Sequence, residues 1–467
     1  MSPVLIGVLA YVFLQLAIGF AVSRGIRDEA DYLLAGRSLG YGLATFSIFA
    51  TWFGAETCIG AAGAIYERGL SGGSADPFGY ALCLLFMGLF FARSLWRRRL
   101  TTLGDLFRTR YSPGIERIAV VFMVPSSIIW AAAQIRAFGQ VLSATSSSEI
   151  GVTVAITIAA VVVIVYTISG GLLADAVTDL VQGVALIIGL VILACAVVDD
   201  LSDPVILQAA IDTERLHIFG GGKLSSLETL EAWAVPVCGS LVAQELVSRV
   251  LATRSPMVAQ RASLLATVVY LLLGGIPVVI GLIGPSLYPD LEHAEQILPL
   301  VAQQQLSSFA YILFAGALVS AILSTVDSTL LAASALVSHN LIVSVVPGLS
   351  EATKIRVARI GVLVFGIIAY VLALYTEGIY HLVETASAFG GAGIFTLFIF
   401  GLCTRIGSAP SAFAALAVGS IVWIHGTYIV ESSAPYVLSL VSAFAAYLIV
   451  AGASRALPSQ RSNRSLP

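Results

Sequence analysis

Residues 50–60 read Ala50-Thr51-Trp52-Phe53-Gly54-Ala55-Glu56-Thr57-Cys58-Ile59-Gly60. Two glycines and the carboxylate of Glu56 lie here inside an otherwise apolar run. In a membrane, the backbone leaves helical geometry only where it is buried in protein or lines a cavity. We therefore predict a helix that is broken at this stretch, with a binding site at the break.

The composition places this stretch in a membrane protein. Hydrophobic residues make up 58% of the 467 residues and charged residues 11%, against roughly 45–50% and about 25% in soluble domains. So few charges exclude a soluble enzyme, a disordered chain and a nucleic-acid binder, and the net charge of −3 favours no polyanionic partner. We predict one all-α polytopic membrane domain over residues 1–467.

Thirteen apolar segments are long enough to cross a bilayer, which takes about 20 residues. They cover approximately residues 3–23, 43–66, 77–96, 116–144, 150–168, 176–198, 230–251, 260–285, 306–338, 356–376, 379–402, 409–430 and 435–453. If the N-terminus lies outside, 20 of the 24 Lys and Arg residues fall in inner connections, as the positive-inside rule requires. We expect an integral plasma (inner) membrane protein whose tail, residues 454–467, is cytoplasmic.

A second interruption lies in the seventh segment, which contains Val235-Pro236-Val237-Cys238-Gly239-Ser240. Pro236 removes a backbone donor and Gly239 loosens the next turn. The two interruptions open two five-helix units, helices 2–6 and 7–11, and the odd number of helices inverts the second unit. This pattern is typical of a secondary transporter with a site at the membrane midplane. The alternative is that Gly and Pro are simply common in membrane helices.

The ninth segment carries a polar face. It contains Ala321-Ile322-Leu323-Ser324-Thr325-Val326-Asp327-Ser328, in which Ser324, Asp327 and Ser328 share one side of a helix. Hydroxyl, carboxylate and carbonyl oxygens are hard ligands that suit Na⁺. Interhelical hydrogen bonding by Ser and Thr is the alternative, but a carboxylate at that depth is costly unless it is paired. In the sixth segment we expect Asp179 inside the membrane and Asp175 at its interface.

The sequence patterns that resemble enzyme sites lack the context that an enzyme requires. Gly69-Leu70-Ser71-Gly72-Gly73 fits the pattern of a nucleophile elbow, but it lies between two helices and follows no strand. The five histidines are scattered, and no pair has zinc-ligand spacing. We predict that the protein is not an enzyme.

Four motifs carry a resemblance to a known family. They are Asp31-Tyr32-Leu33-Leu34-Ala35-Gly36-Arg37-Ser38-Leu39-Gly40, Thr178-Asp179-Leu180-Val181-Gln182, Ala321-Ile322-Leu323-Ser324-Thr325, and Gln244-Glu245 through Arg249 with Ala252-Thr253-Arg254-Ser255. In this order they resemble the sodium:solute symporter family of sodium–proline, sodium–glucose and sialic acid transporters, over about residues 1–455. The resemblance implies a LeuT-type five-plus-five inverted repeat, with one extra N-terminal helix and two extra C-terminal helices, 12 and 13.

The resemblance also implies where sodium binds. The main site would use the carbonyls of Ala50, Phe53 and Ala321 and the hydroxyls of Ser324 and Thr325. A second site in some members implies Asp179, Ser324, Asp327 and Ser328 here, although Asp327 replaces a hydroxyl. Asp179 and Asp327 could instead share a proton, since two close carboxylates rarely both ionise.

The substrate pocket implied by the family would include Trp52, Glu56, Thr57, Asp76, Phe78, Gln134, Arg136 and Gly239. A sugar is disfavoured because Trp52 stands where the sugar transporters have Asn. Arg136 lies about 9 Å beyond the middle of its helix at 1.5 Å per residue, and it either snorkels to the surface or faces a cavity. A guanidinium binds a carboxylate bidentately, so we expect a carboxylate-bearing solute: a monocarboxylate, an amino acid or an acidic sugar.

These expectations combine into a sodium-coupled symporter that imports a small organic solute by alternating access. Its partners would be the solute, Na⁺ and membrane lipid, with no nucleic acid, and a monomer would suffice. The alternatives are a proton-coupled or facilitative carrier on the same fold and a transporter-like sensor.

Overall fold

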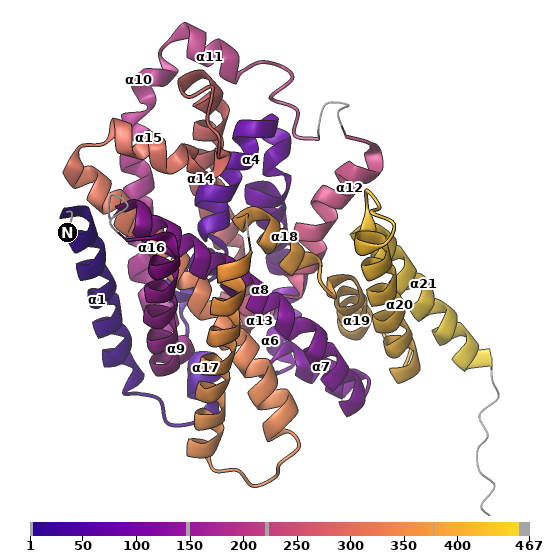
Figure 1. Ribbon diagram of the computed structural model, residues 1–467. Coiled ribbons are helices and arrows are strands. Elements are labelled where there is room, and N and C mark those ends of the chain that lie inside the picture. The colour runs from indigo at the N-terminus through magenta and orange to yellow at the C-terminus, as the bar shows by residue number, and fades with distance from the viewer. Residues whose placement is uncertain (1–2, 146–149, 220–223, 377, 457–467) are drawn as a thin grey trace, which may run out of the picture.

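The computed structural model describes residues 3–145, 150–219, 224–376 and 378–456. Within these ranges the chain is helical, and the one strand-like feature is an isolated bridge between Leu39 and Thr253. Of the expected tail, residues 457–467 lie outside the described part. The all-α prediction is confirmed for the described residues, and Figure 1 shows the helices packed side by side.

The helices follow one another along the chain with short connections. They are α1 (Pro3–Ser23), α2 (Glu29–Leu34), α3 (Tyr41–Trp52), α4 (Ala61–Arg68), α5 (Tyr80–Phe86), α6 (Ala92–Arg97), α7 (Leu103–Arg110), α8 (Pro113–Thr145), α9 (Val152–Ala196), α10 (Val198–Leu201), α11 (Pro204–Ala210), α12 (Ser226–Ala234), α13 (Gln244–Ala252), α14 (Pro256–Leu287), α15 (Ile297–Gln305), α16 (Ser308–Ala335), α17 (Glu351–Tyr375), α18 (Ile379–Ala388), α19 (Gly391–Cys403), α20 (Ala409–Tyr428) and α21 (Pro435–Ala456). Tighter or wider helical turns join some of them: η1 (Ala35–Arg37), η2 (Glu56–Gly60), η3 (Gly69–Gly73), η4 (Ser74–Gly79), η5 (Met87–Phe91), η6 (Val235–Gly239), η7 (Ala294–Gln296) and η8 (Leu336–Val343).

Eight helices of the described chain are long and apolar enough to cross a membrane, or up to ten if two bent pairs each form one span. Two of the eight, Glu56–Arg97 and Val152–Ala196, each cover parts of two predicted segments. Inside α9 the backbone turns at Gly171, whose φ is 59°. The predicted number of thirteen spans, and their grouping into two inverted repeats, stay predictions.

Both predicted interruptions are present. α3 ends at Trp52, and Phe53 leaves helical geometry with φ −88° and ψ 73°. The second interruption separates α12 and η6 from α13, and the two halves are bent by 41°. A third break, which we did not predict, bends α18 against α19 by 46° at Gly390, whose φ is 66°.

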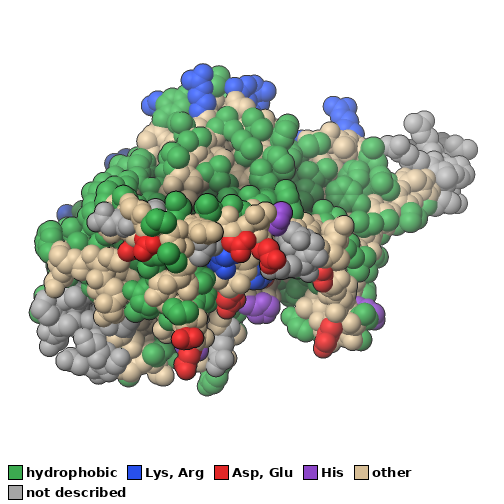
Figure 2. Space-filling model, turned by 90° about the horizontal axis from the view of Figure 1, so that it is seen from above, with side chains coloured by type: hydrophobic (Ala, Val, Ile, Leu, Met, Phe, Trp, Pro, Cys, Tyr) green, Lys and Arg blue, Asp and Glu red, His purple; other side chains and the backbone are tan. Residues whose placement is uncertain are grey.

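The packing suits a bilayer. Small residues bring the central helices together, since a Cβ on Gly189 of α9 would lie 2.5 Å from the Cβ of Ala317 in α16. The outer surface carries exposed apolar side chains such as Phe13, Leu272 and Ile449, at 73%, 71% and 70% exposure. A surface of this kind is stable against lipid tails but not against water. Figure 2 shows hydrophobic side chains reaching the rim, with acidic side chains gathered on the face in view.

Candidate functional site

The break in α3 brings its carbonyls to α16. The hydroxyl of Thr325 donates to the Ala321 carbonyl at 3.2 Å and to the Ala50 carbonyl at 3.5 Å. Gly54 permits this approach, because a Cβ there would lie 2.8 Å from Thr325 Oγ1. Three of the five residues predicted for the main sodium site therefore lie together, and their hard oxygen donors suit Na⁺.

The other two residues predicted for the main sodium site, Ser324 and Phe53, make different contacts. Phe53 forms the break itself, and its amide bonds back to Phe49 O. The Ser324 hydroxyl donates to Asp179 Oδ1 at 2.5 Å, and the Ser47 hydroxyl donates to Asp179 Oδ2 at 2.6 Å. Ser324 thus links α16 to α9 in this structure.

Next to Ser324, four charged side chains are buried between α9, α13 and α16. Their exposed fractions are 4% for Asp175, 0% for Asp179, 2% for Asp327 and 1% for Arg249. Arg249 donates to Asp175 and to the Ser328 hydroxyl, and its Nη2 lies 4.0 Å from Asp179 Oδ2. A guanidinium therefore lies among the residues predicted for a second sodium site.

Asp327 faces another part of this cluster. Its Oδ1 accepts from the Thr167 hydroxyl at 2.6 Å, while its Oδ2 has no hydrogen-bond partner. Asp175 is buried inside the protein and pairs with Arg249, while its expected place at the membrane interface stays a prediction. One guanidinium faces three carboxylates, so the buried cluster has an excess of acidic groups.

Glu56 is held beside the break by side chains of α8. Its carboxylate accepts from Trp130 Nε1 at 3.2 Å and from Gln134 Nε2 at 2.5 Å. Gln134 also accepts the Ala55 amide at 3.0 Å, which satisfies a donor that the broken helix leaves free. These three hydrogen bonds fix the position of α8 relative to the break.

A second polar network covers the other side of the break. The Thr57 hydroxyl donates to Asp76 Oδ2 at 2.7 Å, and Tyr270 donates to Asp76 Oδ1 at 2.8 Å. The hydroxyls of Thr57 and Tyr270 each lie 3.3 Å from the Trp52 carbonyl. Asp76 is fully buried, and it is a structural partner of the broken helix through Thr57.

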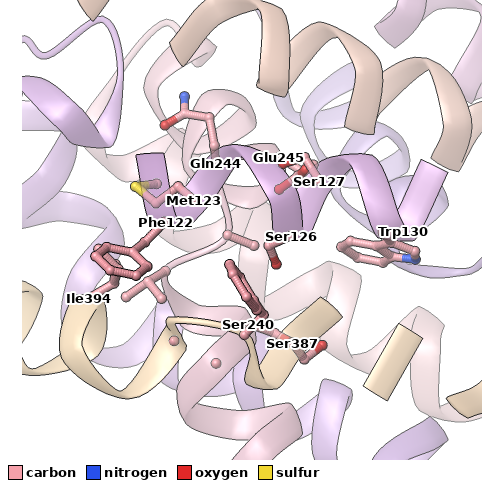
Figure 3. A pocket seen from close by; sticks show the side chains of 15 residues that line it. Phe122, Met123, Ser126, Ser127, Trp130, Ser240, Gln244, Glu245, Ser387 and Ile394 are labelled. Atoms are coloured by element: carbon pink, nitrogen blue, oxygen red, sulfur yellow. Dashed lines mark hydrogen bonds between the residues drawn. The ribbon is translucent and has the colours of Figure 1, made fainter. Parts of the chain in front are cut away.

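A cavity lies between α8, the break at η6 and the break between α18 and α19 (Figure 3). It is lined by Phe122, Met123, Ser126, Ser127, Trp130, Gly239, Ser240, Val242, Ala243, Gln244, Glu245, Ser387, Phe389, Gly391 and Ile394. Glu245 lies beside the Ser127 hydroxyl in this view, and its Oε1 has no hydrogen-bond partner. The lining thus contains one carboxylate and no Lys or Arg.

Aromatic rings continue from the cavity toward the break. The ring of Trp52 meets that of Trp130 edge-on with centroids 4.8 Å apart, and that of Tyr80 with centroids 6.4 Å apart. Trp130 also lines the cavity. Trp130 therefore joins the lining of the cavity to the aromatic rings beside the break.

The remaining residues of the predicted pocket are spread out. Gly239 lines the cavity, and a Cβ there would collide with the Ser387 carbonyl. Phe78 packs over Gly73. Arg136 donates from Nη1 to the Ala373 carbonyl at 3.1 Å, near the end of α17. Arg136 is not among the residues that line the cavity.

Comparison with known proteins identifies the family. The model of the sodium:solute symporter family matches residues 32–419. The chain belongs to the sodium:solute symporter family. The resemblance drawn from its motifs is thereby confirmed, and sodium is the coupling ion of this symporter.

Two relatives and one solved structure describe the similarity. The high-affinity choline transporter 1 of Caenorhabditis elegans is 30% identical over 413 residues, 81% of this chain and 70% of that protein. The sodium/pantothenate symporter of Escherichia coli is 25% identical over 407 residues, 84% and 83% of the two chains. A substrate-bound, outward-open Na⁺-coupled sialic acid symporter has a TM-score of 0.84 at 18% identity, covering 97% and 98% of the chains.

These similarities place the symporter on the LeuT-type fold, as predicted. The relatives are transporters and not enzymes, and the symporter couples sodium to a small solute in an integral membrane setting.

No role in a site is predicted from the sequence for Arg249, Tyr270 or Glu245. Arg249 and Glu245 were within a quoted motif, but their partners lie far away in the chain: Asp175 is 74 positions before Arg249. The charge of Arg249 could have predicted a carboxylate partner, because a buried guanidinium needs a carboxylate.

Proposed function

We propose that this symporter imports a small organic cation, driven by one sodium ion at the break in α3. The observation that supports the sodium part is the hydroxyl of Thr325 beside the carbonyls of Ala50 and Ala321. Sodium there ties α16 to the broken helix and favours the outward-open state. Its release inside frees the inner gate, and each charge that moves down 100 mV supplies about 2.3 kcal/mol.

The cavity supports a cationic solute. Burying a carboxylate without a partner is costly, and Glu245 has an unpartnered oxygen there. A cation beside Glu245 would remove that cost. The ring of Trp130 in the lining, with Trp52 and Tyr80 behind it, adds cation–π attraction of about 0.5–2 kcal/mol. Similarity to high-affinity choline transporters points to the same class, a quaternary or protonated amine.

Arg249 supports coupling to a single sodium ion. Its guanidinium contacts Ser328 and Asp175 and lies near Asp179. In this proposal the guanidinium takes the place of a second sodium ion. The excess of acidic groups is reduced by a proton, for which the free Oδ2 of Asp327 is the acceptor. The orientation with the N-terminus outside is part of the same proposal.

Glu245→Gln should raise the Michaelis constant for an organic cation at least tenfold, about 1.4 kcal/mol, and leave sodium activation unchanged. The amide keeps the shape of Glu245 and one acceptor oxygen but removes its charge. Uptake of radiolabelled choline, with other amines and acids as competitors, measures this in proteoliposomes. Glu228→Gln, at an exposed helix start, is the control. Unchanged affinity in Glu245→Gln would remove Glu245 from the solute site.

A carboxylate-bearing solute is the second candidate. Arg136 supports it, because its Nε has no hydrogen-bond partner, and a sodium/pantothenate symporter is among the relatives. If a carboxylate binds there, Arg136→Lys raises the Michaelis constant for the acid at least tenfold, about 1.4 kcal/mol. If Arg136 only caps α17 through Ala373, Lys keeps normal affinity. Competition by acids but not by amines, together with a weakened Lys variant, would replace the cation proposal.

The coupling ion separates this proposal from its rivals. Uptake with external sodium replaced by potassium, at fixed pH, should fall to the background level. Choline cannot serve as the replacement cation, because it belongs to the proposed solute class. Uptake that persists in potassium and follows an imposed pH gradient would indicate a proton-coupled carrier, and binding without any counterflow would indicate a sensor.

A further inference from the structure

A basic groove lies on the surface where η5 and α6 meet the start of α14, away from the sodium and solute sites. We name it the arginine groove, and it is lined by Gly88, Leu89, Phe90, Arg93, Ser94, Arg97, Arg98 and Gln260. Three of the eight lining residues are arginines, and none carries a carboxylate. The groove lies at the end of the molecule that we expect to face the cytoplasm.

The positive charge of the arginine groove is not neutralised within the protein. Arg93 contacts Met257 Sδ at 3.2 Å, and Arg98 donates to the Leu402 carbonyl at 3.0 Å. Among the residues that the structure describes, no carboxylate pairs with Arg93, Arg97 or Arg98. All three side chains are exposed, so their charge is available to an anion.

Apolar and basic side chains are ordered along the groove. Leu89 and Phe90, at 47% and 65% exposure, precede Arg93 by four and three positions, and Arg97 follows it by four. Residues at such spacings share one side of a helical segment. Gly88 keeps the wall of the groove close, because a Cβ there would lie 2.8 Å from Leu264 Cδ2 of α14. The surface is therefore apolar toward the bilayer and basic toward its edge.

We propose that the arginine groove binds an anionic phospholipid. The phosphodiester lies between Arg93 and Arg97, the amide of Gln260 and the hydroxyl of Ser94 contact the headgroup, and an acyl chain lies on Leu89 and Phe90. The order of the side chains carries this choice: a free phosphate has no use for the apolar part, whereas a phospholipid matches both parts. Basic pockets between helices on the cytoplasmic side bind anionic headgroups in this way.

The test uses the full-length protein in nanodiscs of phosphatidylcholine, alone or mixed with phosphatidylglycerol of the same acyl chains. Native mass spectrometry counts retained phosphatidylglycerol. The Arg93→Gln/Arg97→Gln variant should lose about twenty-five-fold in apparent affinity, from a factor of about five for each guanidinium. The control is Arg117→Gln/Arg356→Gln, which removes the same charge from two other exposed arginines and should retain wild-type binding.

Thermal unfolding gives a second measurement that does not depend on transport. Phosphatidylglycerol should raise the melting temperature of the wild type and of the control, and should not raise that of the groove variant. Equal retention of phosphatidylglycerol by the groove variant and the control would overturn the proposal. So would stabilisation by soluble glycerol phosphate alone, because that would assign the site to a free phosphate and not to a lipid.

Discussion

Arg249→Met should abolish transport and cost about 3–5 kcal/mol of stability, the range for breaking a buried ion pair. The substitution keeps an unbranched side chain but leaves Asp175 and Asp179 without a cation at exposed fractions of 4% and 0%. Asp175 loses its direct partner, and the Ser328 hydroxyl loses a donor. Thermal unfolding in detergent measures the stability change, and sodium-driven uptake measures function.

A second substitution separates charge from packing. Arg249→Met/Asp175→Asn removes both members of the pair and should recover most of the lost stability, because no unpaired charge of the pair stays buried. Arg261→Met, at an exposed position of α14, is the control and should behave like the wild type. If Arg249→Met alone were as stable as that control, Arg249 would not be the resident cation of the cluster.

Thr325→Val should raise the sodium concentration for half-maximal activation at least tenfold, about 1.4 kcal/mol. Valine has the shape of threonine but lacks the hydroxyl that contacts the carbonyls of Ala50 and Ala321. The oxygen set at the break would then lose one of its ligands. Activation curves for sodium, at a fixed solute concentration in proteoliposomes, measure the shift.

The matched control for this position lies one turn further along α16. The Thr329 hydroxyl donates within its own helix to the Val326 carbonyl at 2.8 Å, so Thr329→Val should leave sodium activation unchanged. Thr325→Ser keeps the hydroxyl and should retain most of the sodium affinity. Similar activation curves for Thr325→Val and Thr329→Val would show that the main site has been assigned to the wrong oxygens.

The sequence predicted the parts of the fold that local chemistry controls. Gly54 and the pair Pro236 and Gly239 disrupt helices by their own backbone properties, and both breaks are present. The third break escaped prediction because residues 386–391 read Ala386-Ser387-Ala388-Phe389-Gly390-Gly391, which fits an apolar helix with small residues. At Gly390, which has a left-handed φ, a Cβ would lie 3.0 Å from the Cβ of Phe122 in α8, and this approach is not visible in the local sequence.

The candidate site divides in the same way. The closeness of Thr325, Ala50 and Ala321 was expected from the resemblance to the family, together with the polar stretch and the break. The ion pair of Asp175 was not expected, because its partner Arg249 is supplied by another helix. Arg136 shows the converse: its residue type suggested a ligand, while the end of α17 supplies it with a backbone carbonyl.

The most direct test of a single sodium ion at the break in α3 is the binding of radioactive sodium to the purified symporter. We expect one sodium per chain, bound at least tenfold more weakly in Thr325→Val and with unchanged affinity in Asp179→Asn, since Arg249 already serves as the cation beside Asp179. Two sodium ions per chain in the wild type, or loss of the single ion in Asp179→Asn with Thr325→Val unaffected, would contradict this expectation.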